Sequence, residues 1–216
     1  MSCESENKPM AFLVFEGLDG SGKSTLIKKL HQLLKDRGLP SVLTHEPGGT
    51  SFAEEVRELI LKTEGEPPVP MAELLLYQAS RAQHVEQLIR PSLSQKKWVL
   101  CDRYYGSTLA FQCGGRGLDR NMVDGLNRLA TGGLDPDLWV LLDLSLEESE
   151  RRLQNREGKS DRMDQEKADF HRRVRDYYLS LANAEPEKWL VLNAEASPKE
   201  LLSALELALK ERSWLN

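Results

Sequence analysis

The chain has 216 residues, of which 40% are hydrophobic, and 29 basic against 34 acidic side chains give a net charge of −5. This composition supports a folded core and excludes a wholly disordered chain. The acidic balance argues against a protein that coats nucleic acid or an anionic membrane. The apolar runs are also far shorter than the roughly 20 residues of a membrane-spanning helix.

The cysteines and the N-terminal residues indicate a cellular compartment. Cys3, Cys101 and Cys113 are odd in number and lack CxxC spacing, which favours a reducing environment with neither a disulfide framework nor a zinc site. Residues 1–9 are polar and lack the basic start and apolar middle of a secretory signal. We therefore expect a polar tail and a cytoplasmic location.

Hydrophobic periodicity predicts strands that alternate with helices along the chain. Strands are predicted at 11–16, 40–44, 97–101, 138–143 and 189–193, and helices at 23–38, 51–62, 71–89, 104–112, 120–131, 146–156, 165–183 and 198–211. We expect Pro91 to end the long 71–89 helix. This alternation predicts an α/β fold, a five-stranded parallel sheet flanked by helices in three layers. No repeat or composition shift divides residues 10–216, so one domain is expected.

The first strand leads into a glycine-rich turn, GLDGSGKS at residues 17–24, which matches G-x-x-x-x-G-K-[ST] in full. Glycines let the backbone curl so that its N–H groups face a phosphate, and the next helix adds its positive end. A chance glycine turn is disfavoured by the flanking strand and helix. We predict triphosphate binding, with Lys23 at the β/γ-phosphates, by Gly17, Leu18, Asp19, Gly20, Ser21, Gly22, Lys23, Ser24 and Thr25.

Two further segments carry candidate chemistry. Asp102 follows the predicted strand 97–101, and with the Ser24 hydroxyl it is a candidate Mg²⁺ ligand, although an ordinary strand-terminating acid is the alternative. Residues 151–162 are rich in cations around Gly158, which is typical either of a solvated basic face or of a mobile lid. We favour a lid over about 156–164, in which Arg156 and Arg162 clamp the phosphates.

Several motifs, taken in order, resemble those of the bacterial thymidylate kinases, P-loop kinases of nucleoside monophosphates. They are FEGLDGSGKST (15–25), THEPGGT (44–50), LLLYQASRAQH (74–84), DRYYGSTLAFQCGGRGLD (102–119) and DRMD (161–164). The resemblance implies transfer of the γ-phosphate of ATP to dTMP with Mg²⁺, in a homodimer. It also implies that the lid supplies the catalytic arginine, because the glycine loop here contains none.

The resemblance assigns an acceptor site residue by residue. Tyr77 and Arg81 match the base-binding pair, and they lie four apart on one helix face. Without the resemblance, a core tyrosine and a surface arginine would be the simpler interpretation. The implied set comprises Asp19 at the sugar, Arg57 and Arg103 at the monophosphate, Glu46 near that phosphate and the metal, and Tyr77, Arg81, Thr108, Phe111 and Gln112 around the base. Tyr77, Cys113 and Asp164 depart from the commoner Phe, Gly and Glu of the family.

Two other functions remain open at this level. Another P-loop kinase would share the fold and differ in its acceptor pocket. A non-enzymatic nucleotide switch would need a base-reading motif such as NKxD, which the sequence does not contain. The acidic balance disfavours nucleic acid and membrane partners, so the expected partners are ATP, dTMP and a second copy of the chain.

Overall fold

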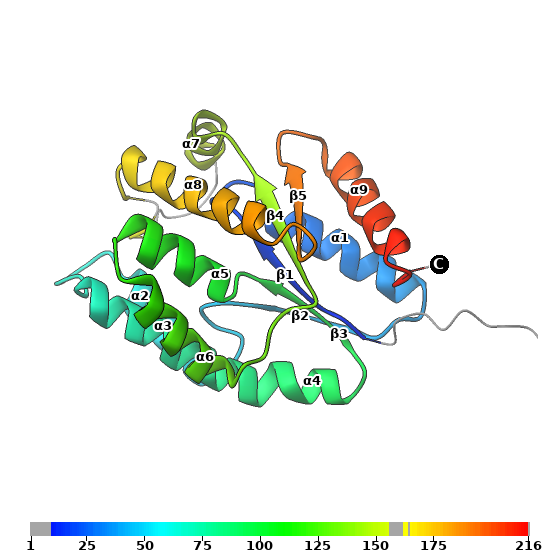
Figure 1. Cartoon of the computed structure of the whole chain (residues 1–216), viewed down its shortest axis with the longest axis horizontal. Helices are drawn as coiled ribbons and strands as arrows, with labels where there is room; N and C mark the ends of the chain where they lie inside the picture. Colours follow the sequence, from blue (N-terminus) through cyan, green and yellow to red (C-terminus); the bar gives the residue numbers. More distant parts are fainter. Residues whose placement is uncertain (1–9, 156–161, 164, 216) are drawn as a thin grey trace, which may run out of the picture.

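The computed structural model describes residues 10–155, 162–163 and 165–215 (Figure 1). Its centre is a parallel sheet of five strands in the order β2-β3-β1-β4-β5. The strands are β1 (Phe12–Glu16), β2 (Ser41–His45), β3 (Trp98–Asp102), β4 (Leu138–Asp143) and β5 (Trp189–Asn193). The predicted parallel sheet is confirmed, and each predicted strand boundary lies within one residue of the observed one.

Helices cover both faces of the sheet, which gives the three layers that the alternation predicts. In Figure 1, α1 and α9 lie on one face, and α3, α5, α6 and α8 lie on the other. The helical segments are α1 (Lys23–Asp36), α2 (Ser51–Leu61), α3 (Pro70–His84), η1 (Val85–Ile89), α4 (Arg90–Ser94), α5 (Tyr105–Thr108), η2 (Leu109–Gly115), α6 (Arg120–Thr131), α7 (Leu146–Gln154), α8 (Ala168–Ala184) and α9 (Pro198–Glu211).

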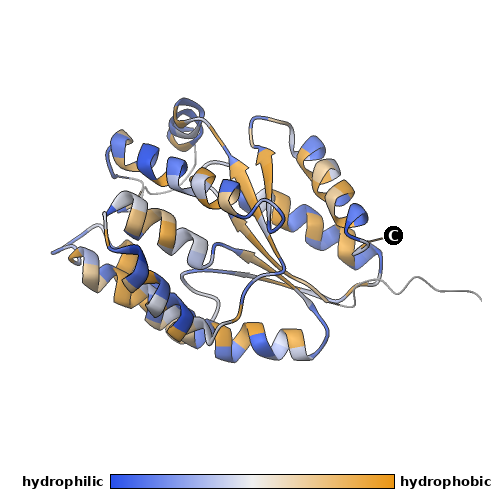
Figure 2. Ribbon diagram, in the orientation of Figure 1, coloured by the Kyte–Doolittle hydropathy of each residue, from blue (hydrophilic) through white to orange (hydrophobic). Residues whose placement is uncertain are grey.

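The sheet separates two hydrophobic cores, because successive side chains of a strand point to opposite faces. In β1, Phe12 and Val14 enter the core beneath α3, α5 and α8, whereas Leu13 and Phe15 enter the core beneath α1 and α9. Figure 2 accordingly shows strongly hydrophobic strands between helices of mixed character. Strands buried on both faces are typical of parallel sheets covered by helices.

Two predicted helices differ from the observed ones. The helix predicted to end at Pro91 continues through the wider π-helical turn η1 into α4, which ends at Ser94. Pro91 occupies the first turn of α4, where its missing N–H is tolerated. The helix predicted at 104–112 is the short α5 followed by the π-helical η2.

Candidate functional site

A cavity of about 820 Å³ opens at the carboxyl ends of β1, β2 and β3. Open parallel sheets bind ligands at this edge. Residues from the glycine loop, β2, α3 and the β3–η2 segment line the cavity together, although they are far apart in the sequence. The predicted site residues among them are Asp19, Gly20, Gly22, Lys23, Ser24, Thr25, Glu46, Arg57, Tyr77, Arg81, Asp102, Arg103, Thr108, Phe111 and Gln112.

The glycine loop adopts backbone conformations that require its glycines. Gly17, Gly20 and Gly22 have φ values of 135°, 79° and 92°. A Cβ on Gly17 would also lie 2.4 Å from the carbonyl oxygen of Leu142. Gly22 directly precedes α1, so the loop leads into the positive end of that helix. The loop therefore forms the backbone cradle that the motif predicts for phosphates.

Lys23 is held inside this cradle. Its Nζ donates to the carbonyl oxygens of Gly17 and Leu18, each at 3.0 Å, and lies 3.9 Å from Oδ1 of Asp19. Burial, helped by the positive charge of Arg103, lowers the pKa of Lys23, while nearby carboxylates oppose the shift. The ammonium is thus fixed by loop carbonyls at the floor of the cavity.

Ser24 and Asp102 meet at the wall of the cavity, at the start of α1 and the end of β3. Ser24 Oγ donates to Oδ2 of Asp102 at 2.8 Å. The described residues contain no group of three or more His, Cys, Asp and Glu side chains placed to hold a metal ion. A cation here would therefore take one hydroxyl and one carboxylate from the protein, and its remaining oxygen ligands from elsewhere.

Arg103 joins the glycine loop to the centre of the cavity. Its Nη2 donates to Oδ1 of Asp19 at 2.9 Å, and its Nη1 donates to Ser107 Oγ and Tyr178 OH, both at 3.1 Å. The guanidinium carbon lies 5.2 Å from the centre of the Phe111 ring. Four side chains thus orient the guanidinium of Arg103, the residue predicted to bind the monophosphate, before any ligand binds.

Beneath Arg103 lies a buried carboxylate that the sequence analysis missed. Glu16 accepts hydrogen bonds from Ser107 Oγ (2.6 Å), Tyr178 OH (2.8 Å), Ser107 N (2.9 Å) and Tyr104 N (3.0 Å). Burial raises the pKa of Glu16, and the charge of Arg103 and these hydrogen bonds lower it, with burial prevailing. Glu16 and Tyr178 are 162 residues apart, so no local pattern reveals the pair.

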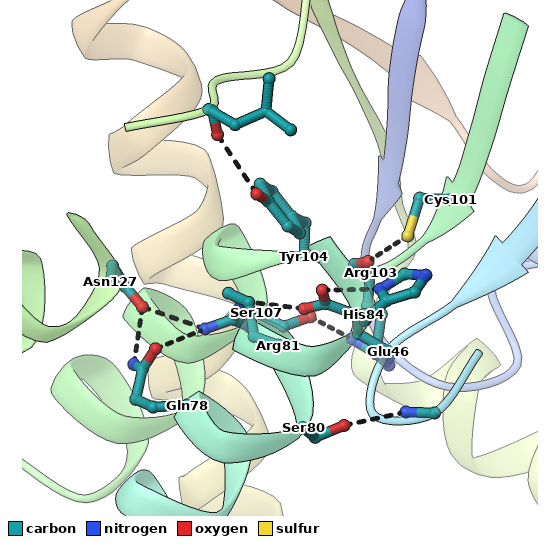
Figure 3. Close-up of polar contacts among 12 residues, drawn as sticks. Glu46, Gln78, Ser80, Arg81, His84, Cys101, Arg103, Tyr104, Ser107 and Asn127 are labelled. Carbon is teal, nitrogen blue, oxygen red and sulfur yellow. Dashed lines mark hydrogen bonds and ion pairs between the residues drawn. The ribbon is translucent and has the colours of Figure 1, made fainter. Parts of the chain in front are cut away.

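Arg81 is buried and held on several sides (Figure 3). Its Nε donates to Oε2 of Glu46 at 2.8 Å, and its Nη1 donates to Asn127 Oδ1 at 3.0 Å and to Gln78 Oε1 at 3.2 Å. The other oxygen of Glu46 lies 3.0 Å from Nδ1 of His84. The simpler interpretation of Arg81 as a surface residue is therefore wrong, because its guanidinium is buried and held in place in the cavity.

The same arrangement shows what Glu46 contacts in the cavity. Glu46, expected near the acceptor phosphate and a metal ion, lines the cavity, and its two oxygens contact Arg81 and His84. A buried guanidinium needs a buried counter-charge, and Glu46 supplies it. Arg57, the other predicted phosphate contact from this region, lines the cavity and donates to the carbonyl oxygen of Pro47 at 2.8 Å.

A recess between α3 and the α5–η2 segment completes the cavity. Tyr77 and Phe111 contribute aromatic rings, and Gln112 and Thr108 contribute polar groups. Thr108 Oγ1 is buried and has no hydrogen-bond partner in the described part of the chain. Buried hydroxyls are normally paired, so this one is available to a ligand. The recess thus offers stacking faces and a few directed polar groups.

Comparisons with known proteins identify the family of this chain. The family model described as thymidylate kinase matches residues 15–205. This chain belongs to the thymidylate kinase family. It is 48% identical to a thymidylate kinase of Bdellovibrio bacteriovorus, with 95% of this chain and 98% of the relative covered. It is 43% identical to one of Pelobacter propionicus, with 90% and 91% covered. The crystal structure of thymidylate kinase from Ehrlichia chaffeensis matches with a TM-score of 0.72 and 34% identity, over 91% of this chain and 98% of that one.

Arg162 lies at a different place from the one that the thymidylate kinase resemblance implies. Arg162 does not line the cavity: its Nε donates to the Ile60 carbonyl oxygen at 2.9 Å, and its Nη2 donates to Oε2 of Glu73 at 2.6 Å. The buried carboxylate of Glu73 attracts the guanidinium to α2 and α3. Met163, its neighbour, lines the cavity instead. Arg156 and Asp164 lie outside the described residues.

Besides Arg103, Arg152 also reaches the glycine loop in this thymidylate kinase fold. Arg152 of α7 lines the cavity and donates to the carbonyl oxygens of Gly20 at 3.2 Å and Ala194 at 3.1 Å. Glu148, one turn earlier, accepts from its Nε at 2.6 Å. The sequence shows Arg152 as one cation in a basic run, and only the packing of α7 against the loop sets it apart.

Proposed function

We propose that the protein is an active thymidylate kinase that transfers the γ-phosphate of ATP to dTMP, yielding ADP and dTDP. The observation that carries this proposal is that the glycine loop and the recess of Tyr77, Arg81 and Gln112 line one and the same cavity. A donor cradle and an acceptor pocket in one space allow direct transfer between two bound nucleotides.

The donor half neutralises and positions the triphosphate. The loop N–H groups and the start of α1 bind the phosphates, and Lys23 exchanges its loop carbonyls for β/γ-oxygens. Arg103, and Arg152 beside the loop, add fixed positive charge. Phosphoryl transfer needs positioning and charge stabilisation more than covalent chemistry from the protein, and these groups supply both.

The acceptor half binds dTMP. Tyr77 and Phe111 provide faces for the thymine ring, and the buried Arg81 donates to a base carbonyl. Asp19 lies beside the sugar, and Arg57 and Arg103 hold the monophosphate. The Glu46 carboxylate keeps Arg81 in place.

Mg²⁺ suits the oxygen pair of Ser24 and Asp102, because Mg²⁺ binds few protein oxygens together with substrate phosphates and water. When bound, the ion would neutralise charge on the phosphate oxygens. The distance of 2.8 Å between Ser24 Oγ and Asp102 Oδ2 supports this proposal, because two oxygens this close could both bind one cation.

An assay of ADP release with ATP, Mg²⁺ and each common monophosphate tests the proposal. We expect dTMP to be the best acceptor and dUMP to be poorer by about 10–200-fold, the range for one methyl group. Purine monophosphates should be poor acceptors, because the proposed base contacts of Tyr77, Arg81 and Gln112 suit the smaller pyrimidine ring. A purine monophosphate used as well as dTMP would identify a different P-loop kinase, and ADP release independent of any monophosphate would contradict the kinase assignment.

We also propose a homodimer formed through α2, α3 and α6. These neighbouring helices carry the exposed apolar side chains Phe52, Leu59, Met71, Leu75 and Leu129, and exposed apolar patches are typical of interfaces. Leu75→Glu should yield monomers by analytical ultracentrifugation, whereas Leu207→Glu on α9, also an exposed leucine, should not. A monomeric wild type would contradict this proposal.

Two expectations stay predictions. No helix in the described ranges is long and apolar enough to cross a membrane, and the cytoplasmic location is still proposed from the cysteine pattern. The lid over about 156–164 and the contribution of Arg156 are likewise proposed from the sequence.

A further inference from the structure

Glu73 is a buried carboxylate of α3 that the proposed chemistry does not use. Its side chain is 1% exposed, and it does not line the cavity. Oε1 accepts from Gln112 Nε2 at 2.9 Å and from Arg116 Nε at 3.1 Å, whereas Oε2 accepts from Arg116 Nη2 at 3.1 Å and from Arg162 Nη2 at 2.6 Å. Gln112, in contrast, does line the cavity. Glu73 therefore lies behind a residue of the base recess.

The charge state of Glu73 decides which way Gln112 faces. Burial alone would raise the pKa of Glu73, but the hydrogen bonds and charge of Arg116, with the hydrogen bonds from Arg162 and Gln112, lower it overall. An ionised carboxylate only accepts hydrogen bonds, so the NH₂ group of Gln112 must face it. The amide oxygen occupies the other branch of the side chain. Within the described part of the chain, this oxygen accepts no hydrogen bond.

We propose that Glu73 is a positioning residue for pyrimidine specificity, because it fixes Gln112 with its amide oxygen available to the base. This inference rests on the proposed function, in which Gln112 meets the base. Thymine and uracil carry an N3–H donor that matches an acceptor. Cytosine carries an unprotonated N3, which would place two acceptors against each other and leave both unpaired. A site built this way rejects the mismatched base strongly.

Glu166 provides a matched control for a purely structural role of Glu73. Its carboxylate lies 2.6 Å from Arg116 Nη2, on the same guanidinium, and is 25% exposed. No hydrogen bond between Glu166 and Gln112 is recorded. Removing the charge of Glu166 perturbs the same arginine without releasing the amide.

The test compares kcat/KM for dTMP and dCMP in the full-length wild type, Glu73→Gln and Glu166→Gln. An amide at position 73 both donates and accepts, so it no longer fixes Gln112. We expect the dTMP:dCMP ratio of kcat/KM to fall by about tenfold in Glu73→Gln, the scale of one buried hydrogen bond. The change should appear mainly in the KM values of the acceptors, with the KM for ATP unchanged. Glu166→Gln should keep the wild-type ratio.

A double-mutant cycle separates action through Gln112 from a general disturbance. In the Gln112→Ala background, Glu73→Gln should leave the dTMP:dCMP ratio unchanged. Glu73→Asp is the second variant to use if Glu73→Gln does not fold. It keeps the negative charge for both arginines but shortens the side chain that reaches Gln112. The dTMP:dCMP ratio of kcat/KM should therefore also fall in Glu73→Asp. An unchanged ratio in a folded Glu73 variant overturns the inference. A wild type that does not phosphorylate dTMP refutes the proposed function instead.

Discussion

Ser24 Oγ donates a 2.8 Å hydrogen bond to Asp102 Oδ2, which ties the start of α1 to the end of β3. If this pair shares one cation, Asp102→Asn should raise the Mg²⁺ concentration needed for half-maximal activity, because a neutral amide binds Mg²⁺ more weakly than a carboxylate. Titration of Mg²⁺ at saturating ATP and dTMP measures the effect. Ser24→Ala should also raise the Mg²⁺ concentration needed for half-maximal activity. The effect of the double variant on that concentration should be smaller than the sum of the two single effects. An unchanged Mg²⁺ dependence in Asp102→Asn would refute the assignment.

Lys23→Ala should nearly abolish phosphoryl transfer while the protein stays folded. Lys23 is the ammonium at the floor of the cavity, and loss of one preorganised charge contact costs about 2.7–4 kcal/mol of transition-state stabilisation. Alanine is also a good helix former at the start of α1. Steady-state ADP release measures the loss, and Lys29→Ala, on the exposed side of the same helix, is the control. Near-normal turnover in folded Lys23→Ala would contradict the assigned role.

Arg81→Met should lower the free energy of unfolding by about 3–5 kcal/mol, because it removes the guanidinium that pairs with the buried carboxylate of Glu46 and leaves that carboxylate in contact with His84 alone. The double variant Glu46→Gln/Arg81→Met should recover much of this loss, since no charge is then stranded. Urea unfolding measures the free energy of unfolding of the wild type, the single variant and the double variant. Equal stability of the single and double variants would show that the pair is not coupled.

Arg162→Ala tests the observed place of that side chain. Because Arg162 is bonded to Glu73 and Ile60, its removal should cost about 1.5–3 kcal/mol of stability, the range for a hydrogen bond to a charged group. We expect kcat to stay within about tenfold of wild type, far from the 10³–10⁵-fold contribution of a transition-state arginine. Single-turnover kinetics measures the rate of transfer, and urea unfolding measures the free energy of unfolding. A thousandfold loss of rate in a stable variant would mean that Arg162 leaves Glu73 during turnover.

Glu16 should make stability depend on pH. Burial raises its pKa in the folded state, so above the unfolded value of about 4.3 the folded protein holds the proton more tightly than the unfolded chain. This contribution to stability is therefore lost as the pH rises from about 4.3 through the folded pKa. Glu16→Gln should remove this dependence of stability on pH. The free energy of unfolding of the variant should therefore increase relative to that of the wild type as the pH rises. Urea unfolding between pH 4.5 and 8 measures this, with the exposed Glu150→Gln as the control for lost charge.

The sequence predicts those parts of the site that local physics determines. The glycine loop is recognisable because positive φ angles demand glycine at fixed spacing, and the strands are recognisable from short apolar runs. Tyr77 and Arg81 required the family resemblance, since an aromatic and a cation four residues apart are common on helices. Glu16, Tyr178, Glu73 and Arg152 were missed because their roles depend on partners far away in the chain. The π-helical turns were missed because segments as short as η1 and η2 change the hydrophobic pattern of the surrounding helix too little to be seen in the sequence.

The two cores described above have an evolutionary consequence. In the described residues they share no side chain: α1, which follows the phosphate cradle, packs with α9, whereas the helices of the acceptor recess pack with α8. Substitutions that reshape the recess therefore act on the core beneath α3, α5 and α8, to which Leu18 of the glycine loop also belongs, while α1 keeps its packing against α9 on the other side of the sheet. A duplicated gene of this architecture can thus vary its acceptor recess while the packing of the helix that follows the phosphate cradle is retained.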